Sequence, residues 1–220
     1  MRSTHVARLL EQIDGKRAYA INHYRRIYVN KLKPLAAALL GAAAITAFAA
    51  PESFTVDPNH TFPSLEVMHF NTSFYRGKFT RTTGKVTLDK AAKTGTVDIA
   101  IDPASIDMGN QKLDDHLKSD SFFDVAKFPT ATYKAGSVKF NGDAPAEVPG
   151  ELTLHGVTKP VTLTFNHFNC YTNAMLKREV CGGDLSATIK RSEFGIKYGA
   201  PFPVADDVKL QIEVEAFKDQ

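Results

Sequence analysis

The chain has 220 residues, 43% of them hydrophobic and 23% charged, with 27 basic and 24 acidic side chains, two cysteines and no tryptophan. This length buries a sizeable core in one domain or two small ones, and 15 phenylalanines exclude a disordered or collagen-like chain. The net charge of +3 comes from residues 1–34, which hold eight basic and two acidic side chains and leave 19 basic and 22 acidic ones beyond them. The later part of the chain is therefore acidic, and no nucleic-acid partner is predicted.

The N-terminal segment has the pattern of an export signal. After the basic residues comes an uncharged run, residues 35–50, that is rich in Ala and Leu and contains the small residues Ala47 and Ala49. This order is typical of a secretory signal peptide, and we expect cleavage after Ala49. A transmembrane anchor is the alternative, but the run is shorter than the ~20 predominantly apolar residues that a span requires. We therefore expect no stable membrane span after cleavage.

The cleavage site divides the chain into two parts. Residues 1–49 are predicted to be the leader, and residues 50–220 a single folded domain. Val29 begins a compact basic segment just before the apolar run, and this segment would serve as the start of a signal peptide by itself. We therefore hypothesise that translation begins at Val29 and that residues 1–28 are a misassigned start.

Beyond the leader, short runs of alternating apolar and polar residues are separated by Gly, Pro, Asn and Asp. The clearest is 208–216, with apolar residues at even positions. Such runs predict antiparallel strands with one buried face, and their number predicts an all-β barrel of about eight strands. Residues 103–109 predict a helical turn and 110–118 a short helix capped by Asn110. We expect this helical insertion to cap one end of the barrel.

Cys170 and Cys181 lie at the two ends of a segment between strand-like runs. In an oxidising compartment such a pair most simply forms a disulfide, whereas in the cytosol it would be two free thiols. Neither the Cys and His pattern of a zinc site nor a CxxC redox motif is present. Because export is predicted, we expect the disulfide.

No catalytic or metal site is predicted. The domain contains five histidines without metal-ligand spacing: His60, His69, His116, His155 and His167. GxSxG, P-loop and GxGxxG motifs are absent from the sequence. Asp115 and His116 are more simply a solvated or capping cluster than a catalytic pair. His69 and His167 lie on otherwise apolar strand faces, where an inward imidazole needs a polar partner in the protein or in a ligand.

A series of ordered motifs covers residues 53–217. They are Asp57–Thr61 (DPNHT), Leu65–Phe70 (LEVMHF), Arg76–Phe79 (RGKF), Ala104–Asn110 (ASIDMGN), Asp114–Asp124 (DDHLKSDSFFD), Lys127–Ala131 (KFPTA), Gly150–Val161 (GELTLHGVTKPV), Ile189–Ile196 (IKRSEFGI) and the terminal strand Asp207–Phe217. Each is weak alone, but together and in this order the chain resembles the YceI-like polyisoprenoid-binding family.

The resemblance implies a lipocalin-like antiparallel barrel with a long apolar channel, exported to the bacterial periplasm. It further implies a polyisoprenoid ligand, an isoprenoid quinone or its precursor, held for transport, storage or a stress response, with no further cofactor required. The expected channel wall is Leu65, Val67, Phe79, Ile99, Ile101, Leu154, Leu163, Phe165, Ile189, Leu210 and Ile212. Met108, Leu113, Leu117, Phe122 and Phe123 are expected to form the helical cap, with His69 and His167 as polar contacts.

Two other functions are compatible with the sequence. One is an enzyme of isoprenoid or quinone metabolism that uses His69 or His116 as an acid or base in the same cavity. The other is a barrel with a filled core that acts as a protein-interaction module. The sequence leaves open the ligand's chain length and head group, and whether the chain forms a homodimer.

Overall fold

The computed structural model describes residues 50–220. The predicted leader 1–49, its cleavage site and the hypothesised start at Val29 lie outside the described residues. The described chain contains, in order, β1 (Glu52–Val56), β2 (Phe62–His69), β3 (Ser73–Phe79), β4 (Thr82–Asp89), β5 (Thr94–Ile101), the 3-10 helix η1 (Pro103–Ser105), β6 (Ile106–Asp107), α2 (Gln111–Lys118), β7 (Ala131–Ala135), β8 (Lys139–Asn141), β9 (Ala144–Leu154), β10 (Val157–Asn173), β11 (Arg178–Lys190), the 3-10 helix η2 (Arg191–Phe194) and β12 (Val204–Lys218).

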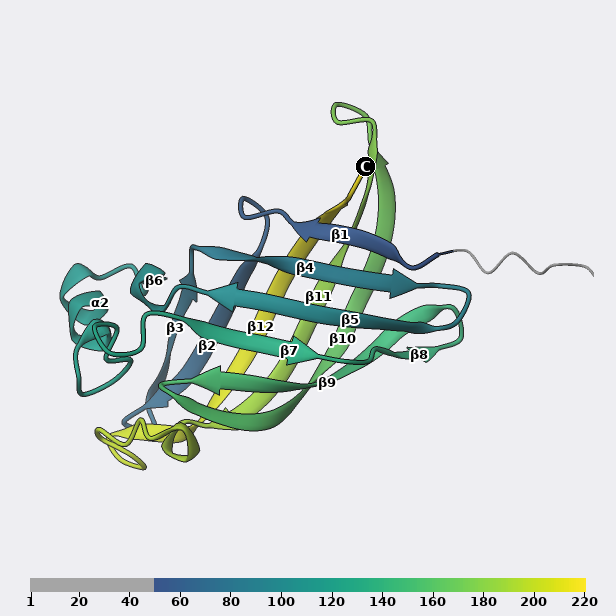
Figure 1. Cartoon of the computed structure of the whole chain (residues 1–220). Helices are drawn as coiled ribbons and strands as arrows, with labels where there is room; N and C mark the ends of the chain where they lie inside the picture. Colours follow the sequence, from purple (N-terminus) through teal and green to yellow (C-terminus); the bar gives the residue numbers. More distant parts are fainter. Residues whose placement is uncertain (1–49) are drawn as a thin grey trace, which may run out of the picture. The chain divides into compact units, whose positions relative to one another are not determined.

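Eight of these strands form a closed antiparallel barrel (Figure 1). The ring runs β1, β4, β5, β7, β9, β10, β11 and β12, and it closes where β12 pairs with β1. β2, β3 and β6 continue the sheet from β12, and β8 pairs with β9. The predicted all-β, lipocalin-like barrel is therefore confirmed. In the described part of the chain, no helix is long and apolar enough to cross a bilayer.

β12 pairs with two strands along the same edge. Its C-terminal end pairs with β1, in the register Val56 to Ala216, and its earlier residues pair with β2, in the register Leu65 to Leu210. Residues 57–61 form a corner between these two pairings. The buried carboxylate of Asp57 stabilises the corner, because it accepts a hydrogen bond from the backbone N–H of Asn59 at 2.9 Å. The corner therefore explains the first of the ordered motifs, Asp57–Thr61.

The helical insertion begins and ends close to its predicted positions. α2 is capped by Asn110, whose Oδ1 accepts hydrogen bonds from the N–H groups of Lys112 and Leu113. The predicted turn over 103–109 is shorter than expected, because η1 ends at Ser105 and the next residue, Ile106, pairs with β3. Figure 1 shows α2 at one end of the barrel, at the left of the view. The expected cap at one end is therefore confirmed.

The side-chain carboxylate of Asp219, close to the C-terminus, stabilises the closure of the barrel. Asp219 accepts hydrogen bonds from the hydroxyls of Thr55 at 2.6 Å and Ser53 at 2.8 Å, both in β1. Its Oδ2 also lies 2.9 Å from Nζ of Lys85 in β4. One side chain therefore connects the last residues of the chain to two strands of the ring.

These contacts predict a loss of stability in acid. The hydrogen bonds from Thr55, Lys85 and Ser53 lower the pKa of Asp219 from 3.8 to about 2. Because the charged form is the one that is stabilised, the contribution is complete well above pH 3.8 and is lost as the pH falls from 3.8 toward 2. We expect the thermal midpoint of the wild type to fall more steeply over this window than that of Asp219→Asn. Parallel curves for the two proteins would contradict this role.

The predicted disulfide is present. Cys170 and Cys181 are directly opposite each other in the β10–β11 pairing and are joined by a bond between their sulfur atoms. The two residues are 11 apart in sequence. The bond therefore closes a short loop at the tip of this hairpin.

Removing the disulfide is expected to destabilise the barrel. Loop-closure entropy for a loop of this size gives a loss of about 2–3 kcal/mol in the free energy of unfolding for the double variant Cys170→Ala/Cys181→Ala. Urea denaturation measures this loss. Dithiothreitol should lower the urea midpoint of the wild type and leave that of the double variant unchanged. A wild-type midpoint that does not respond to the reductant would show that the bond contributes nothing.

Candidate ligand-binding site

The barrel encloses a cavity of about 440 Å³. This volume lies within the ~300–1,000 Å³ of pockets that hold small organic ligands. Thr82 and Leu88, near the two ends of β4, both line the cavity, and at ~3.3 Å per residue they are about 20 Å apart along the strand. The cavity is therefore elongated along the strands, as a chain-like ligand requires.

The wall is made by the inward residues of alternating strands. In β5 these include Val97, Ile99 and Ile101, and in β10 they include Val161 and Leu163. Of the residues predicted to contact a ligand, all but His167 line the cavity: Leu65, Val67, His69, Phe79, Ile99, Ile101, Met108, Leu113, Leu117, Phe122, Phe123, Leu154, Leu163, Phe165, Ile189, Leu210 and Ile212. Their contact with a ligand stays a prediction. Side chains therefore do not fill the barrel interior completely, and a cavity remains between them.

The helical insertion supplies the wall at one end. Leu113 and Leu117, at i and i+4 of α2, both line the cavity. Phe122 and Phe123 follow the helix and are buried in a separate apolar cluster with Ile106 and Ile196. The end of the barrel toward α2 is thus covered by apolar side chains.

The expectation that His167 faces inward is wrong. The alternation in β10 shifts at Asn166, because the pairing with β11 has a bulge between Phe165 and His167. The bulge leaves His167 exposed and places Phe168 in the cavity wall. Gly183 of β11 pairs with Phe168, and a Cβ on this glycine would lie 2.1 Å from the backbone oxygen of His167. A glycine pair inside strand β11, at 182–183, is the sequence signal that could have predicted the bulge.

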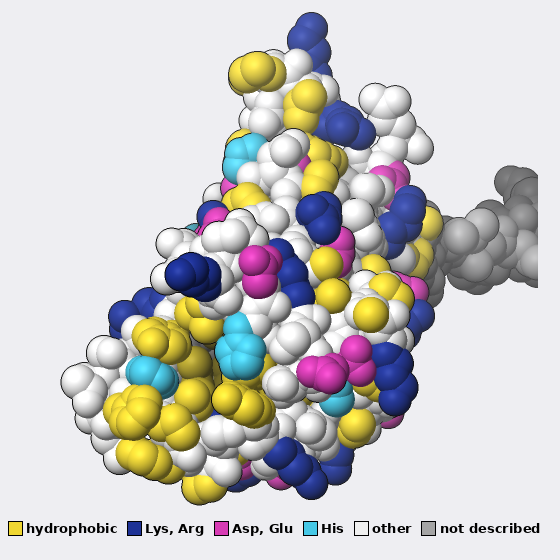
Figure 2. Space-filling view, turned by 90° about the vertical axis from the view of Figure 1, so that its left-hand side faces the viewer, with side chains coloured by type: hydrophobic (Ala, Val, Ile, Leu, Met, Phe, Trp, Pro, Cys, Tyr) yellow, Lys and Arg dark blue, Asp and Glu magenta, His cyan; other side chains and the backbone are white. Residues whose placement is uncertain are grey.

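Aromatic side chains line the cavity where it reaches the surface. His69 stacks on Tyr75 with ring centroids 4.3 Å apart, and His116 of α2 meets the edge of the Tyr198 ring at 5.3 Å. All four line the cavity, and Tyr198 is 57% exposed. Figure 2, which faces the α2 end, shows hydrophobic side chains gathered around a hollow with histidines near it. We call these four residues the aromatic mouth.

The wall also contains polar residues that the sequence analysis missed. The Tyr133 hydroxyl lies 2.6 Å from the carbonyl oxygen of Val148 and 2.9 Å from that of Val161. Burial raises the pKa of Tyr133 to about 12, so the phenol stays neutral. Thr61 donates from its hydroxyl to the backbone oxygen of Glu215 at 3.1 Å. Both groups are therefore already satisfied by the protein.

Arg191 is the buried cation of the wall. It is 5% exposed and lines the cavity. Burial lowers its pKa, but a guanidinium starts so high that it stays charged at neutral pH. Its N–H groups donate to the backbone oxygens of Ile196, Tyr198, Val204 and Ala205. Arg191 therefore fixes the segment between η2 and β12, which carries part of the aromatic mouth.

A family model of the YceI-like domain matches residues 54–216. The chain belongs to the YceI-like family. It is 36% identical over 190 residues to a UPF0312 protein of Pseudomonas paraeruginosa, which covers 84% of this chain and 98% of that protein. A UPF0312 protein of Pseudomonas fluorescens is 35% identical over 193 residues, covering 86% and 98%.

Solved structures share this YceI-like fold. BcnA of Burkholderia cenocepacia is 25% identical with a TM-score of 0.59, covering 73% of this chain and 98% of BcnA. A YceI protein of Campylobacter jejuni is 28% identical with a TM-score of 0.59, covering 66% and 86%. A polyisoprenoid binding domain from Saccharophagus degradans is 16% identical with a TM-score of 0.55, covering 76% and 98%. This last likeness concerns the fold alone.

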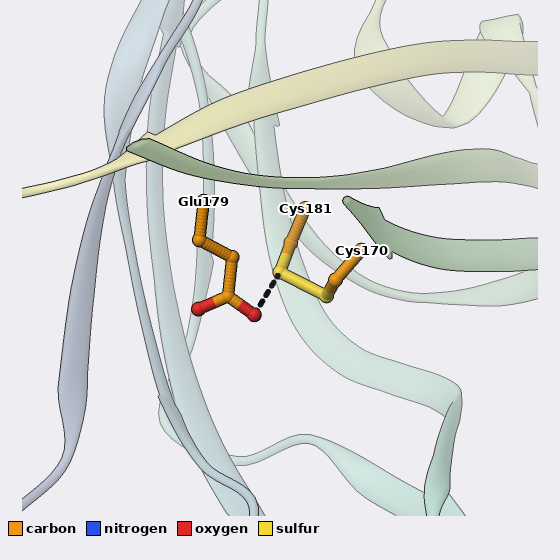
Figure 3. A group of neighbouring side chains, drawn as sticks. All are labelled: Cys170, Glu179 and Cys181. Carbon is orange, nitrogen blue, oxygen red and sulfur yellow. Dashed lines mark hydrogen bonds between the residues drawn. A yellow bond between two sulfur atoms is a disulfide. The ribbon is translucent and has the colours of Figure 1, made fainter. Parts of the chain in front are cut away.

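One cluster of the YceI-like domain has atoms spaced as metal ligands would be. Cys170, Glu179 and Cys181 place ligand atoms within 4.8 Å of one another (Figure 3). The two sulfur atoms are bonded to each other, however, and a metal ligand must be a thiolate. Lys90 Nζ lies 2.9 Å from the Glu179 carboxylate, and this hydrogen bond holds the pKa of Glu179 below its usual value. In its oxidised form the cluster is therefore a structural disulfide, and its sulfur atoms are not available as thiolate ligands.

Proposed function

We propose that this protein is a periplasmic carrier that holds one polyisoprenoid lipid, an isoprenoid quinone or its precursor, inside the barrel. The elongated apolar cavity is the observation that carries this proposal. Each Å² of apolar surface removed from water contributes about 25 cal/mol, so a long isoprenoid tail binds through burial with few polar contacts. A domain of the same fold is described as polyisoprenoid binding, and the apolar cavity leads us to propose the same ligand class for this chain.

The proposed location rests on two features. The basic and apolar leader has the pattern of a secretory signal, and the Cys170–Cys181 disulfide suits an oxidising compartment. In that compartment a carrier would protect an insoluble lipid during transport, storage or stress. Cell fractionation that finds the mature protein in the cytoplasm would overturn this location.

Binding without turnover is favoured over catalysis at the two histidines of the mouth. His69 and His116 contact aromatic rings, and within residues 50–220 neither imidazole has a carboxylate partner to orient it as a base. We therefore propose that the ligand leaves chemically unchanged. Turnover of the bound lipid that is lost in His69→Ala or His116→Ala would favour an enzyme instead.

Mass spectrometry of an organic extract tests the proposal directly. The protein is purified under native conditions from a bacterial periplasm, extracted with solvent, and compared with an extract of the denatured and washed protein. We expect an isoprenoid lipid in close to stoichiometric amount. An extract without lipid, from protein that also fails to take up isoprenoids from vesicles, would favour a protein-interaction module.

A further inference from the structure

Exposed aromatic side chains gather around the cavity mouth. Of the eight large hydrophobic residues that are exposed within residues 50–220, five belong to the β2–β3 hairpin or to the loop before β12: Phe70, Phe74, Tyr75, Tyr198 and Phe202. An aromatic side chain has about 200 Å² of surface and roughly half is exposed here, so the five present about 500 Å². Apolar patches of several hundred Å² on a protein surface are often functional.

The two segments that carry these rings are joined to each other. The N–H of Phe70 donates to the backbone oxygen of Pro203 at 2.7 Å, and the rings of Phe70 and Phe202 meet edge to face with centroids 5.2 Å apart. Phe70 also contacts His69 of the aromatic mouth, with ring centroids 4.6 Å apart. Figure 1 shows the turn between β2 and β3 beside the loop before β12, at the lower left. These phenylalanines therefore extend the aromatic mouth outward onto the surface.

Three of the exposed rings have no part in the cavity wall. Phe70, Phe74 and Phe202 are not among the residues that line the cavity, so a ligand inside the barrel leaves them in water. Phe70 also has a φ of 51°, in the left-handed region that bulky residues rarely adopt. We call these three residues the phenylalanine rim. Neither the core nor the cavity explains its exposure and its backbone strain.

The charges near the rim suit a phospholipid surface. Residues 69–75 contain no acidic residue and no Lys or Arg, and residues 195–204 contain one charged residue, the exposed Lys197. Arg76, which follows the first segment, is paired with Glu66 at 2.6 Å. The two segments therefore have no carboxylate to repel lipid phosphates, although the domain is acidic overall. Lys197 adds attraction to an anionic bilayer.

A bilayer fits this surface better than a protein partner does. The rim lies beside the cavity mouth, so a protein or a second copy of this chain seated on it would close the cavity. A bilayer in contact with the mouth is instead the place from which an insoluble isoprenoid comes and to which it returns. Aromatic side chains also bind favourably in the interfacial region of a membrane.

We propose, resting on the proposed function, that the phenylalanine rim docks the protein on a phospholipid bilayer with the cavity mouth against the membrane. An isoprenoid then passes between bilayer and cavity without crossing water. Docking sets the rate of this transfer, whereas burial of the tail in the cavity sets the amount of lipid bound at equilibrium.

Vesicle binding without any isoprenoid tests docking by itself. Protein is purified from a bacterial periplasm, loss of the apolar run 35–50 is confirmed by mass spectrometry, and the protein is sedimented with vesicles of phosphatidylethanolamine and phosphatidylglycerol. Wild type is compared with the rim variant Phe70→Asn/Phe202→Ser, in which Asn tolerates the left-handed backbone. The tip variant Met175→Ser/Leu176→Ser is the control, because it removes two exposed apolar side chains at the β10–β11 hairpin tip, away from the mouth.

We expect the rim variant to bind these vesicles at least tenfold more weakly than wild type, and the tip variant to bind like wild type. Tenfold is 1.4 kcal/mol, which at about 25 cal/mol per Å² requires about 60 Å² removed from water, less than the two half-exposed rings present. Both variants should hold the wild-type amount of isoprenoid at equilibrium, because none of the changed residues lines the cavity. The rim variant should take it up from vesicles at least tenfold more slowly.

The charge near the rim has a test of its own. Lys197→Gln should weaken binding about fivefold on vesicles that contain phosphatidylglycerol, because it removes one cation near an anionic surface. On vesicles of phosphatidylcholine alone it should bind like wild type. Equal binding to both kinds of vesicle by wild type and Lys197→Gln would contradict the electrostatic part of the proposal.

A tryptophan probe decides the question if the rim variant does not fold. The chain has no tryptophan, so Phe202→Trp reports a single site and keeps an aromatic ring there. Its emission should shift to shorter wavelength when vesicles are added, because the indole leaves water. Met175→Trp, at the hairpin tip, should show no shift.

The outcomes separate docking from lipid binding. If wild type and the rim variant bind vesicles equally and the Phe202→Trp emission does not shift, the docking surface is wrong, and lipid found in the cavity would still support the carrier function. If ultracentrifugation finds a dimer that the rim variant abolishes, and wild type does not bind vesicles, the rim binds a second copy and the proposal is overturned. If wild type docks on vesicles but takes up no isoprenoid, the carrier function fails and the docking surface stands.

Discussion

The Leu163→Asp variant is expected to lose lipid binding at least a hundredfold while its barrel stays folded. Leu163 lies on the inward face of β10, is 8% exposed and lines the cavity. In the unliganded protein, water in the cavity can hydrate the new carboxylate. A bound isoprenoid would remove that water, and stripping an ionised carboxylate of water costs several kcal/mol, where each 1.4 kcal/mol is a factor of ten. Lipid co-purification, quantified by mass spectrometry, measures the loss.

Neighbouring positions supply the controls for this variant. Thr162→Asp places the same charge one residue earlier, on the exposed face of β10, and should retain lipid. Ile101→Asp, on β5, should repeat the loss. Lowering the pH far enough to neutralise the carboxylate should restore part of the binding to Leu163→Asp. If Leu163→Asp keeps its lipid and its circular-dichroism spectrum, the ligand does not occupy the barrel interior.

The alternation of apolar and polar residues predicted most of the cavity wall, because it determines which side chains of a strand face inward. A strand with period two has one inward face, so alternation alone assigns residues such as Ile99, Ile101 and Ile212 to the wall. The helical cap could also be predicted from residues close together in sequence, because Asn110 starts α2 and the leucines of α2 form the apolar face of the helix. His167 was placed wrongly because one extra residue at a bulge reverses every inward assignment that follows it.

The polar part of the wall could not be predicted in the same way. Alternation could place Arg191 on an inward face, but its partners are backbone oxygens of a segment that has no periodic pattern. Whether a hydroxyl is satisfied depends on atoms brought near it by distant strands, as Thr61 shows in meeting Glu215. Thr82 differs from Thr61 in lacking such a partner, and this difference exists in three dimensions alone.

The truncation Arg191→Ala is expected to be the most destabilising of the single substitutions proposed. It would leave four backbone oxygens, the buried one of Ile196 and the partly buried ones of Tyr198, Val204 and Ala205, without this donor. Hydrogen bonds to a charged group contribute about 1.5–3 kcal/mol each, and removing a buried charged partner typically costs ~3–5 kcal/mol in total. We expect a loss of that size in the free energy of unfolding, measured by urea denaturation.

Two further variants separate the hydrogen-bond geometry of Arg191 from its charge. Arg191→Lys keeps the charge but not the planar fork of donors, so it should recover only part of the stability. Lys190→Ala, at the exposed neighbouring position, removes an ion pair with Asp207 and should shift the midpoint far less. Because the segment that Arg191 fixes carries Tyr198 and Pro203 into the cavity wall, Arg191→Ala should also release lipid faster at temperatures where it is still folded. Wild-type stability in Arg191→Ala would mean that the carbonyl oxygens find other donors, and wild-type lipid release would mean that the segment does not hold the ligand.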